Sequence, residues 1–515
     1  MSTFKKKYQP IAYSLVLIAG ILIGNLLKKT DNGISNFQIH QNSKINTILQ
    51  LIQEDYVDTI NQNRIEENAI NSILKELDPH STYINTKKIK VVNEEMQGSF
   101  GGIGVEFNIQ NDSIVVVSPI SGGPSERLGI KSGDRIVEVE DENVAGISIE
   151  NQGVIDRLRG EIGTIVRIKI KRKNENDLID YSITRGEIPL LSLDAKLMLT
   201  NDIGYIKLNR FSGTTTDEFI ESAKSLLNSG MQKLILDLRG NPGGYLGAAI
   251  NVSNQFLDGE EMIVFTEGRN RKRQEFHADK SGLLPQINVV ILVDEGSASA
   301  SEIVAGALQD NDRGVIVGRR TFGKGLVQEQ IPLYDGSVVR LTTQRYYTPT
   351  GRSIQKPYKN GKAEDYFLEV YERGEKDSTK QSDSLFFRTP KGNIVYGGGG
   401  ITPDFFVSID TTLNSKKLRV FFSKNWIFDF CFDYADGHRD NFTKEQLLKR
   451  DIYTDFVSFV NNKNVDFEFD LSANEKNYLI KQLKANIARN LWGNEVFYSI
   501  LLQEDRFVES AIKKF

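Results

Sequence analysis

The part of the sequence that says most about the fold is residues 293–304, which read VDEGSASASEIV. It follows an apolar run, Val289–Val293, and leads into Ala298–Leu308, whose composition is typical of a helix. A serine between a strand and a helix lies beside free backbone N–H groups at the positive end of the helix dipole, where they can stabilise an oxyanion. Serine is also a preferred helix N-cap, so this stretch alone leaves a nucleophilic and a structural serine as alternatives.

Strands and helices alternate on both sides of this stretch, over residues 190–410. The runs that are typical of strands are Ile203–Leu208, Lys233–Leu238, Val289–Val293, Gly314–Val317 and Val338–Tyr347. The runs that are typical of helices are Thr216–Leu227, Leu246–Phe256 and Ala298–Leu308. This alternation predicts an α/β fold for the central part of the chain.

Two glycine-rich stretches could supply partners for a nucleophilic serine. Residues 321–328 read TFGKGLVQ, and burial of Lys324 would lower its pKa, so that a neutral amine could accept a serine proton. An exposed turn lysine is the alternative. Residues 236–244 read LDLRGNPGG, where glycine N–H groups could complete an oxyanion hole and Asp237 could brace the loop by pairing with Arg239. An ordinary structural turn is the alternative here.

Residues 97–187 are rich in short β-type runs and glycine turns. They begin with FGGIGVEF at 100–107, where successive glycines let backbone N–H groups converge on an anion such as a peptide carboxylate. The strand that follows could accept an added peptide strand, with a helix near 149–158 as the other wall of the groove. The stretch resembles the carboxylate-binding loop of PDZ domains, and a glycine-rich hairpin is the alternative. The predicted loop residues are Gly101, Gly102, Ile103, Gly104 and Val105.

The amino-terminal region differs from the rest because residues 8–27 carry no charge and are long enough to cross a bilayer as a helix. Lysines flank this run at 5–7 and at 28–29. No small-residue cleavage site is visible, which favours an uncleaved signal anchor over a cleaved signal peptide. The distribution of lysines predicts a cytoplasmic amino terminus, with the bulk of the chain outside the cytoplasm.

Composition excludes several classes of function. The 64 basic and 68 acidic residues leave a net charge of −4, which gives no electrostatic footprint for nucleic acid. The single cysteine, Cys431, excludes an intrachain disulfide and a multi-cysteine metal site. The four histidines are scattered, so we expect no metal and no cofactor; they are His40, His80, His277 and His438. His80 is interpreted as a turn residue.

The chain resembles the carboxyl-terminal processing peptidases, also called tail-specific proteases. It carries, in this order, a PDZ-like module, DLRGNPGG at 237–244, EGSASASEI at 295–303 and TFGKG at 321–325. The resemblance extends from about Asn42 to Val407. It includes the LDPHS turn at 77–81, YYTPTGRSIQ at 346–355 and YGGGGITPD at 396–404.

The resemblance implies a role for each motif residue. The family's serine lies three residues before the glutamate of the SASE run and 25 before the lysine, and both spacings select Ser299 rather than Ser297 or Ser301. Lys324 then matches the general base, and Gln328 matches the glutamine that holds it. Glu302 is expected to support the site. The oxyanion hole would combine the N–H of Ala300 with that of Gly243 or Gly244.

The implied activity is hydrolysis of peptide bonds through an acyl-enzyme, by a serine–lysine mechanism without a cofactor. The PDZ-like module would recognise substrate carboxyl termini and gate the site, with Arg159 as a candidate coupling residue. A membrane-anchored PDZ scaffold with an idle protease core is the alternative, and an α/β core that hydrolyses other bonds is a second one. The helices at 37–77 resemble dimerising segments.

The predicted fold class is a multidomain α/β protein. Its predicted parts are a signal anchor (1–29), an N-terminal helical region (30–96), a PDZ-like domain (97–187), an α/β serine protease core (188–413) and a mostly helical C-terminal extension (414–515). The extension carries no recognisable chemistry, so a cap or an interaction domain is expected there. The expected partners are proteins or peptides with exposed carboxyl termini and the membrane, and the expected location of the bulk is the periplasm.

Overall fold

The computed structural model describes residues 43–173, 175–358, 363–373, 385–413, 415–439, 442–463 and 467–515. The predicted anchor at 8–27 lies outside these residues. None of the helices in the described ranges is both long and apolar enough to span a bilayer. The anchor, and with it the membrane location, therefore stays a prediction.

The chain divides into two compact units, residues 1–69 and 70–515. Within the described part, the first unit contains α2 (Lys44–Asp55) and the beginning of α3 (Gln62–Lys75). Helix α2 exposes about half of the side chains of Ile45, Ile48 and Leu51. An amphipathic helix normally buries such a stripe against another surface.

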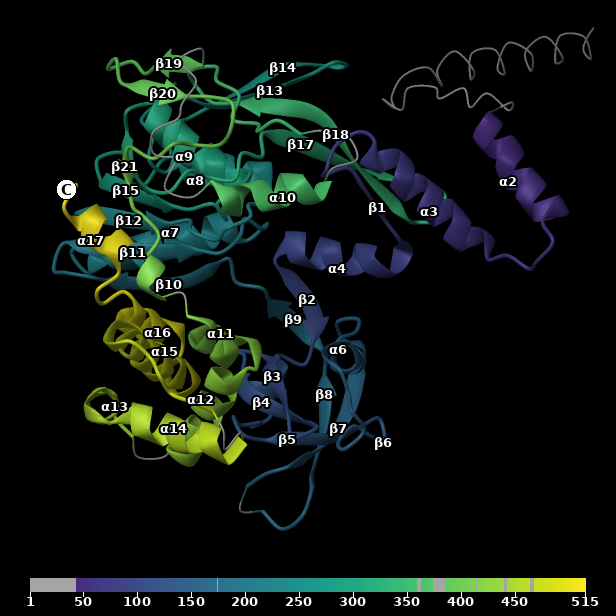
Figure 1. The fold of residues 1–515 in the computed structure, drawn as a ribbon, viewed down its shortest axis with the longest axis vertical. Coiled ribbons are helices and arrows are strands. Elements are labelled where there is room, and N and C mark those ends of the chain that lie inside the picture. The colour runs from purple at the N-terminus through teal and green to yellow at the C-terminus, as the bar shows by residue number, and fades with distance from the viewer. Residues whose placement is uncertain are drawn as a thin grey trace, which may run out of the picture. The chain divides into compact units, whose positions relative to one another are not determined.

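The second unit contains the predicted β-rich module (Figure 1). Its sheet has the order β3-β4-β5-β7-β8, with β6 paired to β5. Val166, Ile168 and Ile170 alternate inward along β7, as expected for a sheet with one buried face. A two-stranded ribbon, β2 with β9, follows α4 and leads into and out of the module. The bounds are α4 (Thr86–Gln97), β2 (Ser99–Gly102), β3 (Val105–Gln110), β4 (Ser113–Pro119), α5 (Pro124–Arg127), β5 (Arg135–Val139), β6 (Glu142–Asn143), α6 (Asn151–Leu158), β7 (Ile165–Lys171), β8 (Ile179–Thr184) and β9 (Gly186–Pro189).

The α/β core predicted for residues 188–413 is built on a six-stranded sheet of order β10-β11-β12-β15-β16-β21, parallel except for the β10–β11 pair. Its strands are near-continuous apolar runs because both faces are covered. Helices α7, α8 and α9 pack on one face. The bounds are β10 (Leu193–Met198), β11 (Ile203–Leu208), α7 (Thr215–Asn228), β12 (Lys233–Asp237), α8 (Leu246–Asn254), β15 (Asn288–Val293), α9 (Ala300–Asp310), β16 (Gly314–Gly318) and β21 (Phe405–Phe406). The α/β prediction is confirmed for this region.

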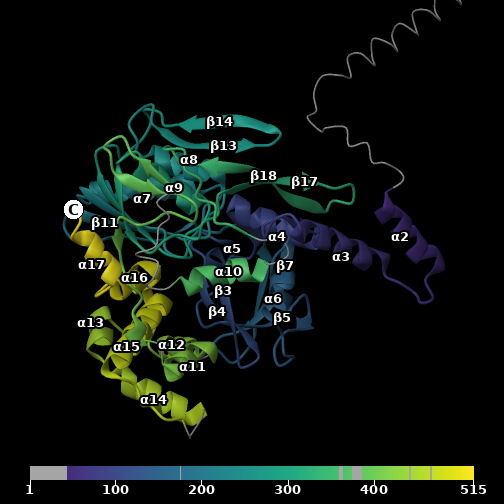
Figure 2. The same ribbon diagram turned by 45° about the horizontal axis from the view of Figure 1, so that its top comes forward.

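A second sheet has five strands, and Lys324 lies in the loop just before one of them, β17 (Figure 2). Its order is β1-β18-β13-β14, with β17 also paired to β18. The predicted strand Val338–Tyr347 belongs to this sheet rather than to the six-stranded one. The bounds are β1 (Thr82–Ile84), β13 (Met262–Gly268), β14 (Arg271–His277), β17 (Leu326–Pro332) and β18 (Val338–Tyr347). Smaller elements follow, namely α10 (Ala363–Glu372), β19 (Phe386–Arg388), β20 (Ile394–Tyr396) and η2 (Thr411–Leu413).

The C-terminal region is helical, as predicted, and has an aromatic core of its own. Phe421, Phe430 and Phe456 pack there beside Cys431, whose thiol is buried within hydrogen-bonding distance of the Leu483 carbonyl. The cysteine is therefore a core residue. The bounds are α11 (Lys416–Ser423), α12 (Trp426–Gly437), α13 (Lys444–Lys449), α14 (Ile452–Lys463), α15 (Ala473–Trp492), α16 (Asn494–Leu501) and α17 (Arg506–Ile512).

This helical region is tied to both neighbours. Helix α17 brings Val508 and Ala511 onto the second face of the six-stranded sheet, against Tyr205 and Leu292 (Figure 1). Helix α17 thus completes the core around the six-stranded sheet. The sequence patterns did not predict this contact, because it joins segments some two to three hundred residues apart.

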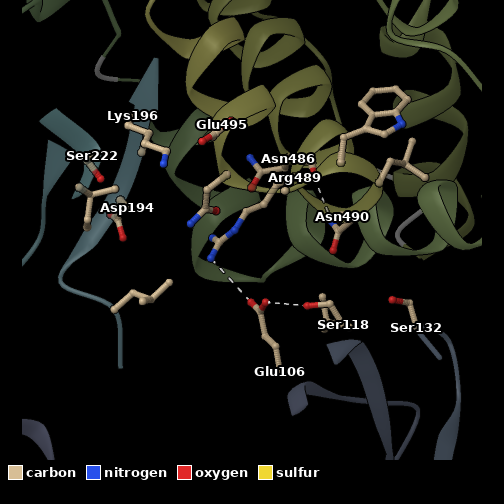
Figure 3. Close-up of a pocket in the computed structure, with 18 of the residues that line it drawn as sticks. Glu106, Ser118, Ser132, Asp194, Lys196, Ser222, Asn486, Arg489, Asn490 and Glu495 are labelled. Carbon is tan, nitrogen blue, oxygen red and sulfur yellow. Dashed lines mark hydrogen bonds and ion pairs between the residues drawn. The ribbon is translucent and has the colours of Figure 1, made fainter. Parts of the chain in front are cut away.

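The helical region also contacts the β-rich module. Phe432 of α12 is buried against Val115 and Val117 of β4. An ion pair of 3.7 Å joins Arg489 of α15 to Glu106 of β3, beside a pocket of about 700 Å³ (Figure 3).

Candidate active site

Ser299 lies at the junction between β15 and α9 with a backbone φ of +56°. A positive φ is uncommon for a residue with a Cβ and stores strain, so its surroundings must hold it there. Its N–H donates to Glu302 Oε2 at 2.8 Å, one turn into the helix. The side chain is half-buried and lines a pocket of about 550 Å³.

The two neighbouring serines do not reach this pocket. Ser297 and Ser301 are fully buried. Ser297 Oγ donates to the Leu238 carbonyl at 2.8 Å, and Ser301 Oγ donates to the Asn241 carbonyl at 2.9 Å. Both hydroxyls therefore fasten the serine turn to the loop that follows β12, and of the three serines only Ser299 faces the pocket.

Lys324 lines the same pocket from the loop before β17. Burial lowers the pKa of its ammonium, and the nearby Arg340 charge lowers it further, against weaker opposing effects of Glu302 and Asp78. Its Nζ donates to Gln328 Oε1 at 3.2 Å. The structure thus brings together Ser299, Lys324 and Gln328, as the sequence predicted they would be.

The turn before β1 orients the glutamine, a role that the sequence did not reveal. Gln328 Nε2 donates to the His80 carbonyl at 2.6 Å. Asp78 holds this turn through Oδ1, which accepts from the N–H groups of His80 and Ser81 at 2.8 Å. Burial lowers the pKa of His80 to about 4, so its imidazole is neutral. His80 is a turn residue as interpreted, and its contribution is a backbone carbonyl that residue type does not signal.

Glu302 ties the two halves of the site together. Although fully buried, it accepts four hydrogen bonds: Oε1 from Thr321 Oγ1 at 2.5 Å and from the Gly323 N–H at 2.7 Å, and Oε2 from the N–H groups of Ser299 at 2.8 Å and Lys324 at 2.9 Å. Burial raises its pKa to about 7 even though these donors act in the opposite direction. Its predicted supporting role fits this placement.

Tyr346 of β18 makes a second link that the sequence did not reveal. Its buried hydroxyl lies 3.0 Å from the Ser299 carbonyl and 2.5 Å from the Lys324 carbonyl. The only signal for it is the YYTPTGRSIQ stretch, which begins at this residue.

The glycines of the loop after β12 approach the serine closely. Gly243 has φ of +95°, and a Cβ there would lie 2.6 Å from the Ala298 carbonyl oxygen. Its N–H already donates to Asn241 Oδ1 at 2.9 Å. Among the described residues, the N–H groups of Gly244 and Ala300 have no acceptor. This favours Gly244 over Gly243 as the partner of Ala300 in an oxyanion hole.

Asp237 and Arg239 form the predicted charge pair, 2.5 Å apart, at the end of β12. Burial alone would raise the pKa of Asp237, but Arg239 and Lys207 hold it well below its usual range. Arg239 also pairs with Asp505 at 3.0 Å, just before α17. Neither member of the predicted pair lines the pocket, and this position is compatible with the predicted role of bracing the loop.

The predicted carboxylate loop is narrower than expected. Gly101 and Gly102 lie in β2, paired with Glu187 and Gly186 of β9, so their backbones belong to that ribbon. The turn between the two strands consists of Ile103 and Gly104, with Gly104 at φ of +77°, and Val105 is the first residue of β3.

Arg159 lies at the end of α6, and its guanidinium stacks 3.8 Å from the centre of the Phe100 ring. It pairs with Glu94 of α4 at 3.4 Å. Helix α4 also contributes Asn93 and Met96 to the pocket that contains Ser299. A continuous path of contacts therefore joins the β-rich module to the candidate site.

No group of three metal-ligating side chains occurs within the described ranges. The pocket presents the hydroxyl of Ser299, the amine of Lys324 and the backbone N–H groups of Gly244 and Ala300. This set is suited to acyl transfer.

Comparison with known proteins agrees with this geometry. Residues 202–366 match the model of peptidase family S41, and residues 101–183 match that of the PDZ domain. Over 350 residues the chain is 36% identical to the carboxy-terminal-processing protease of Bartonella bacilliformis, covering 67% of this chain and 78% of that protein. The chain belongs to peptidase family S41, the carboxy-terminal processing proteases. It is therefore a serine-type protease with a PDZ domain.

Other similarities cover further parts of this S41 chain. Carboxy-terminal processing protease CtpA of Bacillus subtilis is 36% identical over 330 residues, covering 64% of this chain and 69% of that one. Residues 24–88 match the N-terminal domain of the activating protease CtpB, and residues 418–493 match a family of unknown function. The solved photosystem II D1 C-terminal processing protease is 26% identical, covering 72% of this chain and 88% of that one, with a TM-score of 0.37.

Proposed function

We propose that this S41 protease is an endopeptidase in which Ser299 is the nucleophile and Lys324 the general base. The observation that carries the proposal is the position of Lys324 Nζ. It is fixed by Gln328 in the pocket that Ser299 lines, and burial lowers its pKa. A neutral amine in this place can accept the serine proton, as the triad histidine does in other serine proteases.

The reaction then proceeds through an acyl-enzyme. Lys324 Nζ takes the proton as Ser299 Oγ attacks the peptide carbonyl, and the N–H groups of Ala300 and Gly244 stabilise the oxyanion. The lysine passes the proton to the leaving amine as the C–N bond breaks. Water, deprotonated by the same amine, then releases the acyl group from Ser299. Glu302 keeps the serine and lysine backbones in register throughout.

The PDZ domain supplies substrate selection in this proposal. An extended carboxyl terminus would add to the free edge of β3, with its carboxylate at the Ile103–Val105 turn. Binding there would reach the site through Arg159, Glu94 and α4, which lines the pocket. A bound carboxyl terminus can change the balance between an inactive and an active arrangement of the site only by as much as its affinities for the two arrangements differ.

The proposal also includes a membrane anchor at residues 8–27, with the PDZ and protease domains in the periplasm. Its support is the uncharged 20-residue run with flanking lysines. A homodimer through the N-terminal helices is proposed as well. Its support is the exposed apolar stripe of α2, which a second copy could cover.

Cleavage of an unstructured protein with an apolar carboxyl tail tests the catalytic assignment. The full chain, solubilised in detergent, should cleave it, and Ser299→Ala and Lys324→Ala should each lower kcat by roughly a thousandfold or more. Ser297→Ala is the matched control for Ser299→Ala: it should lose stability but keep the mechanism. Binding of the tail without turnover by the parent chain would instead support a PDZ scaffold with an idle core.

A further inference from the structure

Arg340 stands in the active-site pocket without a role in the chemistry above. It lies on β18, where its Cα pairs with Gln330 of β17. Two residues further along, Thr342 pairs with Gln328, the glutamine that holds the general base. Arg340 and Tyr346, both on β18, line this pocket.

The guanidinium of Arg340 has no direct partner, although the charge of Glu95 on α4 lies near enough to act on it. Among the described residues it has neither an ion-pair nor a hydrogen-bond partner. The described residues that line the pocket include no aspartate or glutamate, and the other cation among them, Lys324, must be neutral to act as a base. Arginine stays protonated at any working pH, so Arg340 is the permanent positive charge of this pocket.

A half-buried guanidinium has lost part of its hydration, and no hydrogen bond from a described residue replaces it here. Its planar fork of donors matches a carboxylate, which it can bind with two parallel hydrogen bonds. A peptide in the pocket presents carboxylates of two kinds, those of acidic side chains and that of its own carboxyl terminus.

We propose that Arg340 forms a carboxylate-binding subsite that selects peptides with a negative charge near the scissile bond. This inference rests on the proposed function, because it assumes that the pocket holds a peptide. The subsite is distinct from the carboxylate turn of the PDZ domain at Ile103–Val105. It would act on the segment being cut rather than on a distant tail.

Matched peptides provide the test. The substrates are fluorogenic peptides amidated at the carboxyl end, so that the PDZ domain has no terminal carboxylate to bind. In each pair of peptides, one position near the scissile bond carries either Glu or Gln, and successive pairs move this position along the peptide. The full chain should prefer Glu at one position by roughly tenfold in kcat/KM. Arg340→Gln should abolish that preference, and Arg340→Glu should prefer Lys at the same position. A free-acid series with the bond close to the carboxyl end distinguishes the terminal carboxylate from an acidic side chain.

Arg345→Gln is the control, because Arg345 lies on the same strand, is exposed and is not among the residues that line this pocket. It should keep the preference for Glu. A preference that survives in Arg340→Gln, or the absence of any preference in the parent chain, would overturn the proposal.

Peptide binding separates this inference from the proposed function. In a Ser299→Ala background, fluorescence anisotropy should show the Glu peptide bound roughly tenfold more tightly than the Gln peptide, and Arg340→Gln should remove the difference. If the parent chain cleaves no peptide but this difference is present, the proposed mechanism fails and the subsite stands. If cleavage occurs while neither rates nor binding depend on Arg340, the subsite fails and the mechanism stands.

Discussion

Gly243 illustrates how little room the site leaves at single residues. Its α-carbon approaches the Ala298 carbonyl and the Ala300 N–H so closely that a Cβ would lie 2.6 and 2.8 Å from them. It also adopts φ of +95°, which side chains other than glycine's rarely allow. The closeness of the two backbones is what brings the N–H groups of Gly244 and Ala300 into one site.

Gly243→Ala should therefore lower both stability and activity. Strain at this backbone conformation costs about 1–3 kcal/mol, and the collision with residues 298–300 would displace the serine turn. Chemical denaturation and the kcat of the purified variant measure the two effects. Gly247→Ala in α8 is the control, since nothing lies within 4 Å of its added Cβ. It should be neutral or stabilise the protein by up to about 1 kcal/mol. Full activity in Gly243→Ala would show that the loop after β12 does not contribute to the active site.

The pH dependence of cleavage should follow the ionisation of Lys324. Burial and Arg340 lower its pKa, whereas Glu302 and Asp78 raise it, and His80 beside it is neutral. In the proposed mechanism the neutral amine is the active form, so kcat/KM should rise with pH through the pKa of Lys324 in the folded state, which lies below the usual value for lysine.

Arg340→Gln removes a like charge beside the base, so the rising limb should move to higher pH. The pH profile of kcat/KM on an uncharged amidated peptide is the measurement. Arg345→Gln should leave the limb in place. If the rising part of the pH profile is unchanged in Arg340→Gln, or moves to lower pH, the guanidinium does not act on Lys324.

At the scale of elements, helix α4 is the part that joins recognition to chemistry. One of its sides carries Glu94, which pairs with Arg159, and the other carries Asn93 and Met96, which line the pocket. The ion pair is about one-quarter exposed on the arginine side, so it is worth more than a fully exposed pair.

A double-mutant cycle with Arg159→Gln and Glu94→Gln tests this path. For each variant the measured quantity is the ratio of the cleavage rate of a tailed substrate to that of an amidated substrate. We expect the two substitutions to be coupled in this ratio by about 0.5–1 kcal/mol. Arg157→Gln is the control. Arg157 lies on α6, next to Arg159, but pairs with Glu142 within the PDZ domain, so its substitution should not couple to Glu94→Gln. Additive effects of Arg159→Gln and Glu94→Gln would exclude α4 as the link.

The sequence predicted the elements whose residue types carry chemistry or periodicity. Ser299, Lys324 and Gln328 came from the resemblance to the carboxyl-terminal processing peptidases, and β11 came from an apolar run. Strand β14 was not predicted, because RKRQEFH is charged and exposed along most of its length and shows no clear alternation. The His80 carbonyl was not predicted either, since every residue has one.

At the scale of the whole molecule, the C-terminal helices bind the PDZ domain to the protease core. They contact the core through Val508 and through the Arg239–Asp505 pair, and the PDZ domain through Phe432. The pocket in Figure 3 lies between these three parts and contains none of the catalytic residues. Nothing in residues 414–515 signals these contacts, because their partners are far away in the sequence.

Phe432→Ala should weaken the contact between the PDZ domain and the C-terminal helices without unfolding the protease core. Truncating a buried phenylalanine costs about 3–5 kcal/mol when its surroundings cannot collapse. Hydrogen exchange should accelerate in β4, which holds Val115 and Val117, and stay unchanged in β12. Phe422→Ala, at an exposed position of α11, should change stability by about 0.5 kcal/mol or less. Unaltered exchange in β4 would show that Phe432 does not hold the PDZ domain.

The packing of α17 on the six-stranded sheet also governs when the enzyme can form during its synthesis. A ribosome makes β11 and β15 long before α17, so the nascent sheet has one apolar face exposed until residues 506–512 have been made. The core, and with it the setting of Ser299, can therefore be completed only late.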